Sequence, residues 1–279
     1  MTTTPSLRIY QLDAFTDTLY KGNPAAVVPL TDQNQWLTDA QMQTIAAENN
    51  LAETAFYLRT DTGYHIRWFT PTVEIDLCGH ATLAAGYVIF FLENATESDA
   101  TDAITFDSRS GPLKVCRNDD GWLTLDFPAD VLQKAAVQPP ALLAGLGGPK
   151  PLEIHKGKTD FMVVYAAQED IESLTPDFRE LSTVPARGVI VTAPGTDVDF
   201  VSRFFGPQSG IDEDPVTGSA HTTLAPYWAN RLDKTELTAR QLSKRGGYLR
   251  CKLHGDEETG KRVDISGQVQ LYLKGEIRL

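Results

Sequence analysis

The residues of this chain that could do chemistry stand at the starts of two predicted helices. One helix opens with Gly79 and His80, and the other opens with Gly218 and Ser219. A helix N-terminus offers backbone N–H groups and a partial positive charge, and glycine lets a ligand approach the backbone closely. Two such ends facing each other would suit carboxylate or enolate oxygens. The alternative is two ordinary helix starts, with glycine for tight packing and Ser219 as a cap.

Glu53 is the candidate acid/base. It opens a predicted strand and is followed directly by Thr54, Ala55, Phe56 and Tyr57. A carboxyl group that is partly buried among such neighbours favours its proton-bearing form. A general acid/base that works at neutral pH needs that property. The alternative is a solvated glutamate at the end of a strand.

His80 and Asp214 are the other candidate site residues. A helix N-terminus disfavours a positive imidazole, so we expect His80 to act as a neutral donor or acceptor. Asp214 lies four residues before Gly218, within the acidic run 212–214. This run lacks the spacing of a calcium loop, the cysteines show no CxxC pair and no His/Cys metal spacing, and we predict no metal in the chain. The alternatives are a structural histidine and an aspartate that caps or solvates a loop.

The two helix starts belong to a repeated pattern. Arg67 and Arg203 each begin a copy that reads Arg, two aromatics, a small residue and Pro, followed by an acidic loop and a glycine. From Arg67 to Gly79 is 12 positions, and from Arg203 to Gly218 is 15. A short loop insertion explains the difference, because loops tolerate insertions. The repeat predicts two similar lobes.

The elements around these helices read mainly as strands. Residues 81–92 and 222–228 have no polar face, so each is expected to be a helix buried on all sides. The economical solution is an α+β fold in which each lobe is a mostly antiparallel sheet around one central helix. We place the first lobe at 1–117, completed by the strand 265–279, and the second at 118–264. A capped helix is predicted at 38–48, and strands at 7–15, 25–30, 53–58, 64–69, 103–106, 113–116, 122–127, 159–165, 188–192, 199–205, 248–253, 262–265 and 269–273.

Composition narrows the functional classes. The chain has 279 residues, with 42% apolar and 22% charged residues, as globular proteins do. A net charge of −12 argues against nucleic-acid binding, which needs a basic surface. No apolar run is long enough for a membrane span, and no secretory signal is visible. Cys78, Cys116 and Cys251 stand far apart, so we expect free thiols in the cytoplasm.

Four ordered stretches together resemble one known family. They are 13–28, which contains Gly22-Asn-Pro-Ala-Ala-Val-Val28, then Asn50-Leu-Ala-Glu-Thr54, Cys78-Gly-His-Ala-Thr82 and Glu213-Asp-Pro-Val-Thr-Gly-Ser-Ala220. The set is similar to the PhzF-like isomerases of phenazine biosynthesis, within the diaminopimelate epimerase superfamily. The resemblance implies two pseudo-symmetric lobes, each a barrel-like sheet around a helix, with the active site between them. It also implies no cofactor and, often, a homodimer.

The resemblance also assigns roles. Glu53 matches the family's acid/base glutamate, and His80 and Asp214 match its site histidine and aspartate. The donors around the substrate match Gly79, Gly218 and Ser219. Epimerase relatives carry a catalytic cysteine at such helix starts. Here those places hold His80 and Ser219, which argues against a two-thiol racemase.

The sequence therefore predicts an isomerase that needs no cofactor. Glu53 would remove a proton from carbon and return it to a different carbon of a small carboxylate-bearing metabolite. Two alternatives stay open: a racemase or epimerase on the same fold, and a non-catalytic metabolite-binding protein. The substrate itself is not predicted, because one fold serves many substrates.

Overall fold

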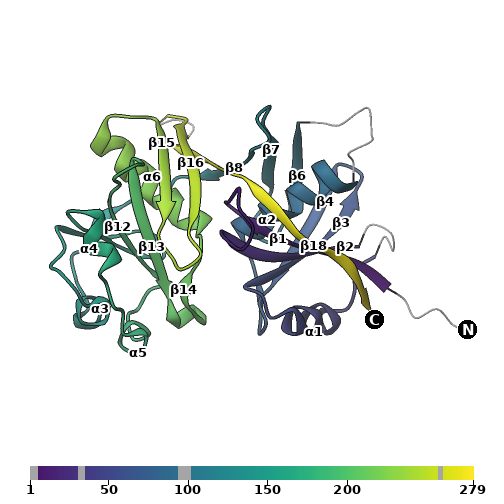
Figure 1. The fold of residues 1–279 in the computed structure, drawn as a ribbon, viewed down its shortest axis with the longest axis horizontal. Helices are drawn as coiled ribbons and strands as arrows, with labels where there is room; N and C mark the ends of the chain where they lie inside the picture. The colour runs from purple at the N-terminus through teal and green to yellow at the C-terminus, as the bar shows by residue number, and fades with distance from the viewer. Residues whose placement is uncertain (1–5, 31–34, 94–101, 257–259) are drawn as a thin grey trace, which may run out of the picture. The chain divides into compact units, whose positions relative to one another are not determined.

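The computed structural model describes residues 6–30, 35–93, 102–256 and 260–279 (Figure 1). The chain divides into two compact units. The first unit comprises Met1–Asp126 with Ser266–Leu279, and the second comprises Phe127–Ile265. The sequence placed the main boundary after residue 117, whereas the division falls after Asp126. Each unit is described by itself below.

The first unit is built from strands and two helices. Strand β1 pairs antiparallel with β2 and β18, β3 with β4, β4 with β5, β6 with β7, and β7 with β8. The pairs β2–β3 and β4–β6 are parallel. The elements are β1 (Ser6–Ala14), β2 (Asn23–Pro29), α1 (Asp39–Asn49), β3 (Glu53–Thr60), β4 (Gly63–Phe69), β5 (Glu74–Ile75), α2 (Gly79–Tyr87), a π-helix (Val88–Glu93), β6 (Ala103–Asp107), β7 (Leu113–Arg117), β8 (Leu123–Pro128) and β18 (Val269–Arg278).

Helix α1 forms where its capping residues predict it. The Thr38 side chain accepts from the Gln41 backbone N–H, and the Gln41 side chain accepts from the Thr38 backbone N–H. This reciprocal pair satisfies two donors that the helix itself leaves unpaired. At the other end, Asn50 adopts a left-handed conformation with φ of 46°, which ends the helix.

Helix α2 is the central helix of the first unit. Its residues from His80 to Gly86 are all buried, and it packs against β1, β2, β3, β7 and β18. At Gly86 an added Cβ would lie 3.0 Å from Val115 Cγ1 on β7, so glycine lets helix and sheet approach closely. The prediction of a helix buried on all sides over 81–92 is confirmed up to Gly86, whereas Tyr87, Phe91 and Leu92 are half-buried and the helix continues from Val88 as a π-helix.

The second unit repeats this plan with more short helices. Antiparallel pairs join β9 to β10, β10 to β11, β12 to β13, β13 to β14 and β15 to β16, and parallel pairs join β11 to β12 and β13 to β15. The elements are β9 (Gln133–Lys134), α3 (Pro140–Leu146), β10 (Glu153–Lys156), β11 (Phe161–Val164), α4 (Gln168–Glu172), α5 (Phe178–Leu181), β12 (Val189–Pro194), β13 (Phe200–Gly206), a 3-10 helix (Pro207–Ser209), β14 (Ile211–Asp214), α6 (Gly218–Leu232), β15 (Glu236–Gln241), β16 (Gly247–His254) and β17 (Arg262–Gly267).

Helix α6 is the counterpart of α2, with one difference. The helix buries Ala220, Leu224, Ala225 and Trp228. Its other face is only half-buried, at Thr222 and, one turn further along, at Pro226 and Tyr227. The prediction that this helix is enclosed on all sides is therefore wrong for one face. The last turn of this 15-residue helix, beyond the predicted range, carries the exposed polar residues Asn230 and Arg231. The α+β class, with a mostly antiparallel sheet and a central helix in each unit, is confirmed.

Candidate active site

The arginine that begins each copy of the repeat forms a paired contact with a glutamate in its own unit. Arg67 donates from Nε and Nη2 to the two carboxylate oxygens of Glu74, at 2.7 and 2.8 Å. Arg203 donates in the same way to Glu213, at 2.7 and 3.1 Å. Such paired bonds fix orientation as well as distance. Each arginine therefore ties its strand to the acidic loop that leads into the central helix, which explains why the pattern occurs twice.

In the first unit, the start of α2 lies beside the first residue of β3. The parallel register pairs Glu53 with Ala25, two residues after Asn23. This places Glu53 beside His80, with 3.1 Å between Glu53 Oε2 and His80 Nε2. Each of these two residues is only 6% exposed. The two atoms lie at ion-pair distance but are not aligned as a hydrogen bond.

Two further side chains approach the other ring nitrogen of His80. Asn23 Nδ2 lies 3.2 Å from His80 Nδ1, and Cys78 Sγ lies 3.5 Å from the same atom. Cys78 is the N-cap residue of α2, and its side chain forms no capping hydrogen bond among the described residues. The ring is therefore held from both sides, by Asn23 and Cys78 at Nδ1 and by Glu53 at Nε2.

The charges around His80 act against the expected neutral imidazole. Burial lowers the pKa of His80, but Cys78 and Glu53 raise it, and the result lies well above the usual value. Burial also raises the pKa of the Cys78 thiol to about 11. Two features act the other way: the helix N-terminus disfavours a positive ring, and Asn23 Nδ2, which can only donate, favours an unprotonated Nδ1.

In the second unit, Asp214 is held in place before α6. Thr217 Oγ1 donates to Asp214 Oδ2 at 2.5 Å. Gln241, which is 1% exposed, donates from Nε2 to the Asp214 carbonyl at 2.8 Å and accepts from the Thr217 backbone N–H at 2.8 Å. A buried amide thus fixes both ends of the loop that carries the aspartate. The sequence did not single out Gln241, because a lone glutamine at the end of a strand carries no motif.

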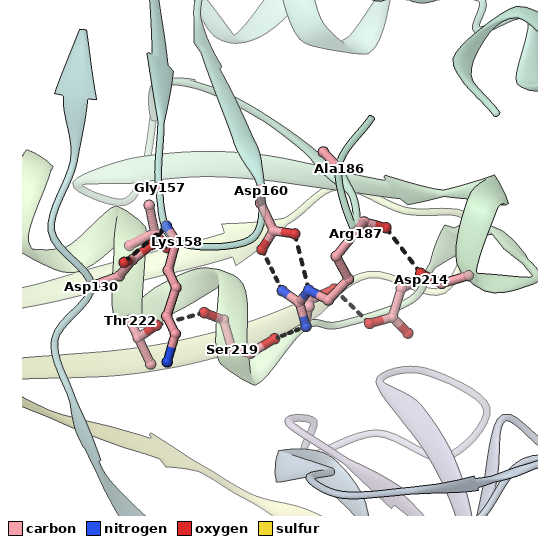
Figure 2. A network of polar contacts seen from close by, with 12 residues as sticks. Asp130, Gly157, Lys158, Asp160, Ala186, Arg187, Asp214, Ser219 and Thr222 are labelled. Atoms are coloured by element: carbon pink, nitrogen blue, oxygen red, sulfur yellow. Dashed lines mark hydrogen bonds and ion pairs between the residues drawn. The ribbon is translucent and has the colours of Figure 1, made fainter. Parts of the chain in front are cut away.

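Ser219 is bound to an arginine and is not the cap of its helix. The N-cap residue of α6 is Thr217. Ser219 Oγ accepts from Arg187 Nη1 at 2.9 Å, and Arg187 Nε donates to Asp160 Oδ1 at 2.9 Å. Arg187 Nη2 also pairs with Asp160 Oδ2, so the guanidinium is held by two bonds to a carboxylate that is nearly fully buried. Figure 2 shows Arg187 between Asp160 and Asp214, with one edge turned to Ser219.

Asp130 contacts the side of helix α6 (Figure 2). Asp130 accepts from Thr223 Oγ1 at 3.0 Å and from the Lys158 backbone N–H at 3.2 Å. An added Cβ at Gly157 would lie 2.2 Å from Asp130 Oδ2, so glycine is needed for this approach. These bonds hold the turn before β11 against α6.

His221 lies two residues after Ser219 and differs from His80. It is fully buried, its Nδ1 donates to the Thr217 carbonyl at 2.9 Å, and its Nε2 has no hydrogen-bond partner among the described residues. Burial lowers its pKa to about 4, so the ring is neutral near neutral pH. This histidine fills the core beside Phe200, with ring centroids 5.9 Å apart.

A separate cavity of about 700 Å³ lies in the second unit. Its lining includes Lys134, Lys156, Lys158 and Phe161. None of the six predicted site residues lines it. Among the side chains that could hold a metal, Glu53, Cys78 and His80 each offer one ligand atom, and these atoms lie within 4.8 Å of one another.

Comparison with known proteins places the chain in a family. The family model described as phenazine biosynthesis-like protein matches residues 12–275. The chain belongs to this PhzF family. An uncharacterized isomerase of Pseudomonas aeruginosa is 49% identical over 274 residues, which cover 98% of this chain and 99% of that protein. The crystal structure of a PhzF-family protein of Enterococcus faecalis is 45% identical, covers 99% of this chain and 100% of its own, and has a TM-score of 0.89.

A more distant structure shows the wider fold group. A hydroxyproline epimerase of Agrobacterium vitis has a TM-score of 0.65 and 11% identity, with 100% of this chain and 94% of that chain covered. This likeness concerns the fold alone. The predicted family and the epimerase-like fold are confirmed, and as a PhzF-family member the chain fits an isomerase. Within the described ranges, no helix has the length and apolar character that crossing a membrane requires.

Proposed function

We propose that this chain is a cofactor-independent isomerase that moves a proton between two carbon atoms of a small carboxylate-bearing metabolite. Glu53 is the acid/base. The observation that carries the proposal is the buried pair of Glu53 and His80 at the start of α2, with 3.1 Å between Oε2 and Nε2. Outside a reactive site, a buried charged pair brings little net stability, because desolvation offsets the attraction. Perturbed groups of this kind cluster at functional sites.

The arrangement of Glu53 and His80 suits a general base. Cys78 and Glu53 raise the pKa of His80 against the effect of burial, which favours a proton on the ring beside Glu53. Glu53 takes a proton from a carbon next to the substrate's electron-withdrawing group, and the C–H electron pair moves into the conjugated system. Glu53 then returns the proton to a different carbon of that system. One base serves both steps, so protons and electrons balance within the substrate.

The helix ends would stabilise the intermediate charge. The first-turn backbone at Gly79 and at Gly218 offers N–H groups for carboxylate or enolate oxygens. Each well-placed donor of this kind is worth about 3 kcal/mol in a transition state. We assign Ser219, held by Arg187, to the substrate carboxylate, and Asp214 to positioning of the substrate. Both assignments rest on the family resemblance and on the ordered contacts of these side chains.

The nearest alternative is a racemase or epimerase, which needs a second base on the opposite face of the carbon. Asp214 would have to serve, and its Oδ2 already accepts the Thr217 hydroxyl at 2.5 Å. His221 is neutral but its ring is enclosed in the core. These contacts favour a single base. A metabolite-binding protein is the other alternative, and it has no use for an acid/base pair.

The test is proton exchange in heavy water, followed by NMR, with a panel of small unsaturated and amino carboxylates. Wild type is compared with Glu53→Gln and with Glu48→Gln, the same substitution at an exposed glutamate on α1. We expect only wild type and Glu48→Gln to shift a C–H from one carbon to another, with deuterium at the receiving carbon to the extent that the proton on Glu53 exchanges with solvent before its return. Exchange confined to one inverted stereocentre would select the epimerase. Equal exchange with Glu53→Gln would remove Glu53 from the mechanism.

The remaining expectations are part of this proposal. We propose a homodimer and a cytoplasmic location, both on the family resemblance. Light scattering coupled to gel filtration measures the dimer directly. A single species at the mass of one 30.7 kDa chain would refute it.

A further inference from the structure

Three buried side chains at the start of α2 form a set of zinc-type ligands. Glu53, Cys78 and His80 each offer one ligand atom, and these atoms lie within 4.8 Å of one another. All three residues are buried, at 6% exposure each. Thiolate, imidazole and carboxylate are the ligands that bind Zn²⁺ in proteins, and three of them with one open position make the pattern of an accessible zinc site.

We propose that this cluster binds Zn²⁺ and that the bound ion occupies the acid/base pair and blocks it. The binding stands on the geometry of the three side chains. Only the blocking effect rests on the proposed function.

The three side chains are close enough to share one ion after a local rearrangement. Their ligand atoms lie within 4.8 Å of one another, whereas two ligands of one zinc ion lie roughly 3.3 to 3.5 Å apart, from zinc–ligand lengths of about 2.0 to 2.3 Å and tetrahedral angles. Cys78 Sγ lies 3.5 Å from His80 Nδ1, and Glu53 Oε2 lies 3.1 Å from His80 Nε2. Because Cys78 and Glu53 meet different ring nitrogens, one of them must rotate about its own side-chain bonds to share a single nitrogen.

The backbone places these residues independently of any ion. Cys78 and His80 are fixed by the first turn of α2, and Glu53 is fixed by the parallel pairing of β3 with β2. The charges also balance. Zn²⁺ with a carboxylate, a thiolate and a neutral imidazole has no net charge, which matters because an uncompensated charge is costly to bury.

The thiolate sets the selectivity. Soft sulfur ligands favour Zn²⁺ over Mg²⁺ and Ca²⁺, which prefer sets of oxygen ligands. The chain carries a net charge of −12, so weak binding of cations at surface carboxylates is expected as background. That background does not depend on Cys78, and this separates it from the proposed site.

The experiment is a titration of the reduced, full-length protein with Co²⁺, a spectroscopic substitute for Zn²⁺. We expect one equivalent to produce a thiolate-to-cobalt charge-transfer band in the near ultraviolet, and Zn²⁺ to remove it by competition. Cys78→Ser should abolish the band. Cys116→Ser, at a half-buried cysteine of β7, is the matched control and should keep it. A band that survives in Cys78→Ser, or no band with wild type at millimolar Co²⁺, would overturn the proposal.

A second variant guards against a folding defect in Cys78→Ser. Glu53→Gln keeps the thiol and should keep the band, with an affinity at least tenfold weaker because an anionic ligand becomes neutral. An unchanged affinity would contradict the role of Glu53 as a ligand. Circular dichroism of each variant checks that the fold is intact.

Inhibition is measured separately from binding. With a substrate found by the exchange experiment, Zn²⁺ at the competing concentration should stop exchange, a chelator should restore it, and Mg²⁺ should have no effect. If cobalt binding requires Cys78 but no compound exchanges, the metal-site proposal is supported and the proposed reaction is refuted. If a compound exchanges but no such cobalt binding occurs, the proposed reaction is supported and the metal-site proposal is refuted.

Discussion

The starts of the two central helices share a framework and differ in their chemistry. In both units an arginine, Arg67 or Arg203, is bound by two hydrogen bonds to the acidic loop before the helix. At the first helix start stand a carboxylate and an imidazole. At the second stands Ser219, bound to Arg187. Both copies share this framework, but the first helix start presents a glutamate beside a histidine and the second presents a hydroxyl bound to a guanidinium.

The buried histidines of the two units show how neighbours decide protonation. Burial alone lowers the pKa of a histidine, and His221, which meets a backbone carbonyl and aromatic rings, follows that rule with a pKa of about 4. His80 is equally enclosed, yet its pKa is raised by the carboxylate at 3.1 Å. Enclosure therefore does not predict the charge of a histidine until its partners are known.

The largest expected effect is on catalytic activity, and it distinguishes the start of α2 from the start of α6. Glu53→Gln removes the only group to which we assign proton transfer, and a general acid/base contributes about 10²- to 10⁴-fold. We expect kcat to fall by that factor with little change in KM, measured with the substrate found by the exchange experiment. Asp214→Asn, at the other helix start, should instead raise KM more than it lowers kcat. Equal losses of kcat in both variants would point to two bases and so to an epimerase.

The next prediction concerns pH. The contributions of His221 and His80 to folding stability should change with pH in opposite directions. The pKa of His221 is about 4 in the folded chain, against 6.5 as the ordinary value. The unfolded chain therefore binds an additional proton between these pH values, and folding stability falls as pH falls through this window. The loss is on the order of 3 kcal/mol, from 1.36 kcal/mol for each pKa unit.

His80 should act in the opposite direction. Its raised pKa means that its stabilising contribution is present below the ordinary value of 6.5 and is lost as pH rises through the folded value. Urea unfolding of wild type and of Glu53→Gln, repeated across pH, measures this. We expect the difference between the two proteins to shrink on the alkaline side. A difference that stays constant with pH would show that Glu53 does not control the charge of His80.

A smaller effect is expected for the repeated arginines. Arg203→Met removes the arginine bound to the partly buried Glu213, whereas Glu74 keeps Arg109, at 2.7 Å, in Arg67→Met. Loss of one member of such a pair costs about 2 kcal/mol, less than for a fully buried pair. We expect both variants to lower the free energy of unfolding, Arg203→Met by more, with additive losses in the double variant because the two arginines belong to different units. An equal or larger loss for Arg67→Met would show that Arg109 does not compensate at Glu74.

The regular elements were predictable because their causes are local. Alternation along β1, the Thr38 cap and the apolar run of α2 all act within a few residues. The repeat located both helix starts, and the structure assigns its arginines to the loops before them. The enclosure of α6 was overestimated, because a run of apolar residues does not reveal how far the covering strands extend.

The contacts within the site were not predictable from pattern. Glu53 meets His80 only because β3 pairs with β2 in one parallel register, and register between distant strands is not written in the periodicity of either. Asn23 was visible only as part of the stretch 13–28 that carries the resemblance, with no role assigned to it. Arg187 lies in a bend before β12 and Gln241 ends β15, both without a motif, so nothing local marks them before the fold brings them to α6.

The smallest effect tests how much of the second helix start belongs to substrate binding. Ser219→Ala removes the hydroxyl that accepts from Arg187 and leaves the two bonds from Arg187 to Asp160 in place. Loss of one hydrogen bond to a charged group is worth about 1.5 to 3 kcal/mol when its partner is left unpaired, and less here because Arg187 keeps Asp160. We therefore expect a rise of KM of about fivefold with kcat nearly unchanged, since binding is lost equally in ground and transition states. Thr222→Ala, at a half-buried hydroxyl of the same helix that bonds back to the Ser219 carbonyl, is the control and should leave KM unchanged. If kcat fell with Ser219→Ala and KM did not move, the hydroxyl would act on the transition state, and the second helix start would share in the chemistry that we assign to the first.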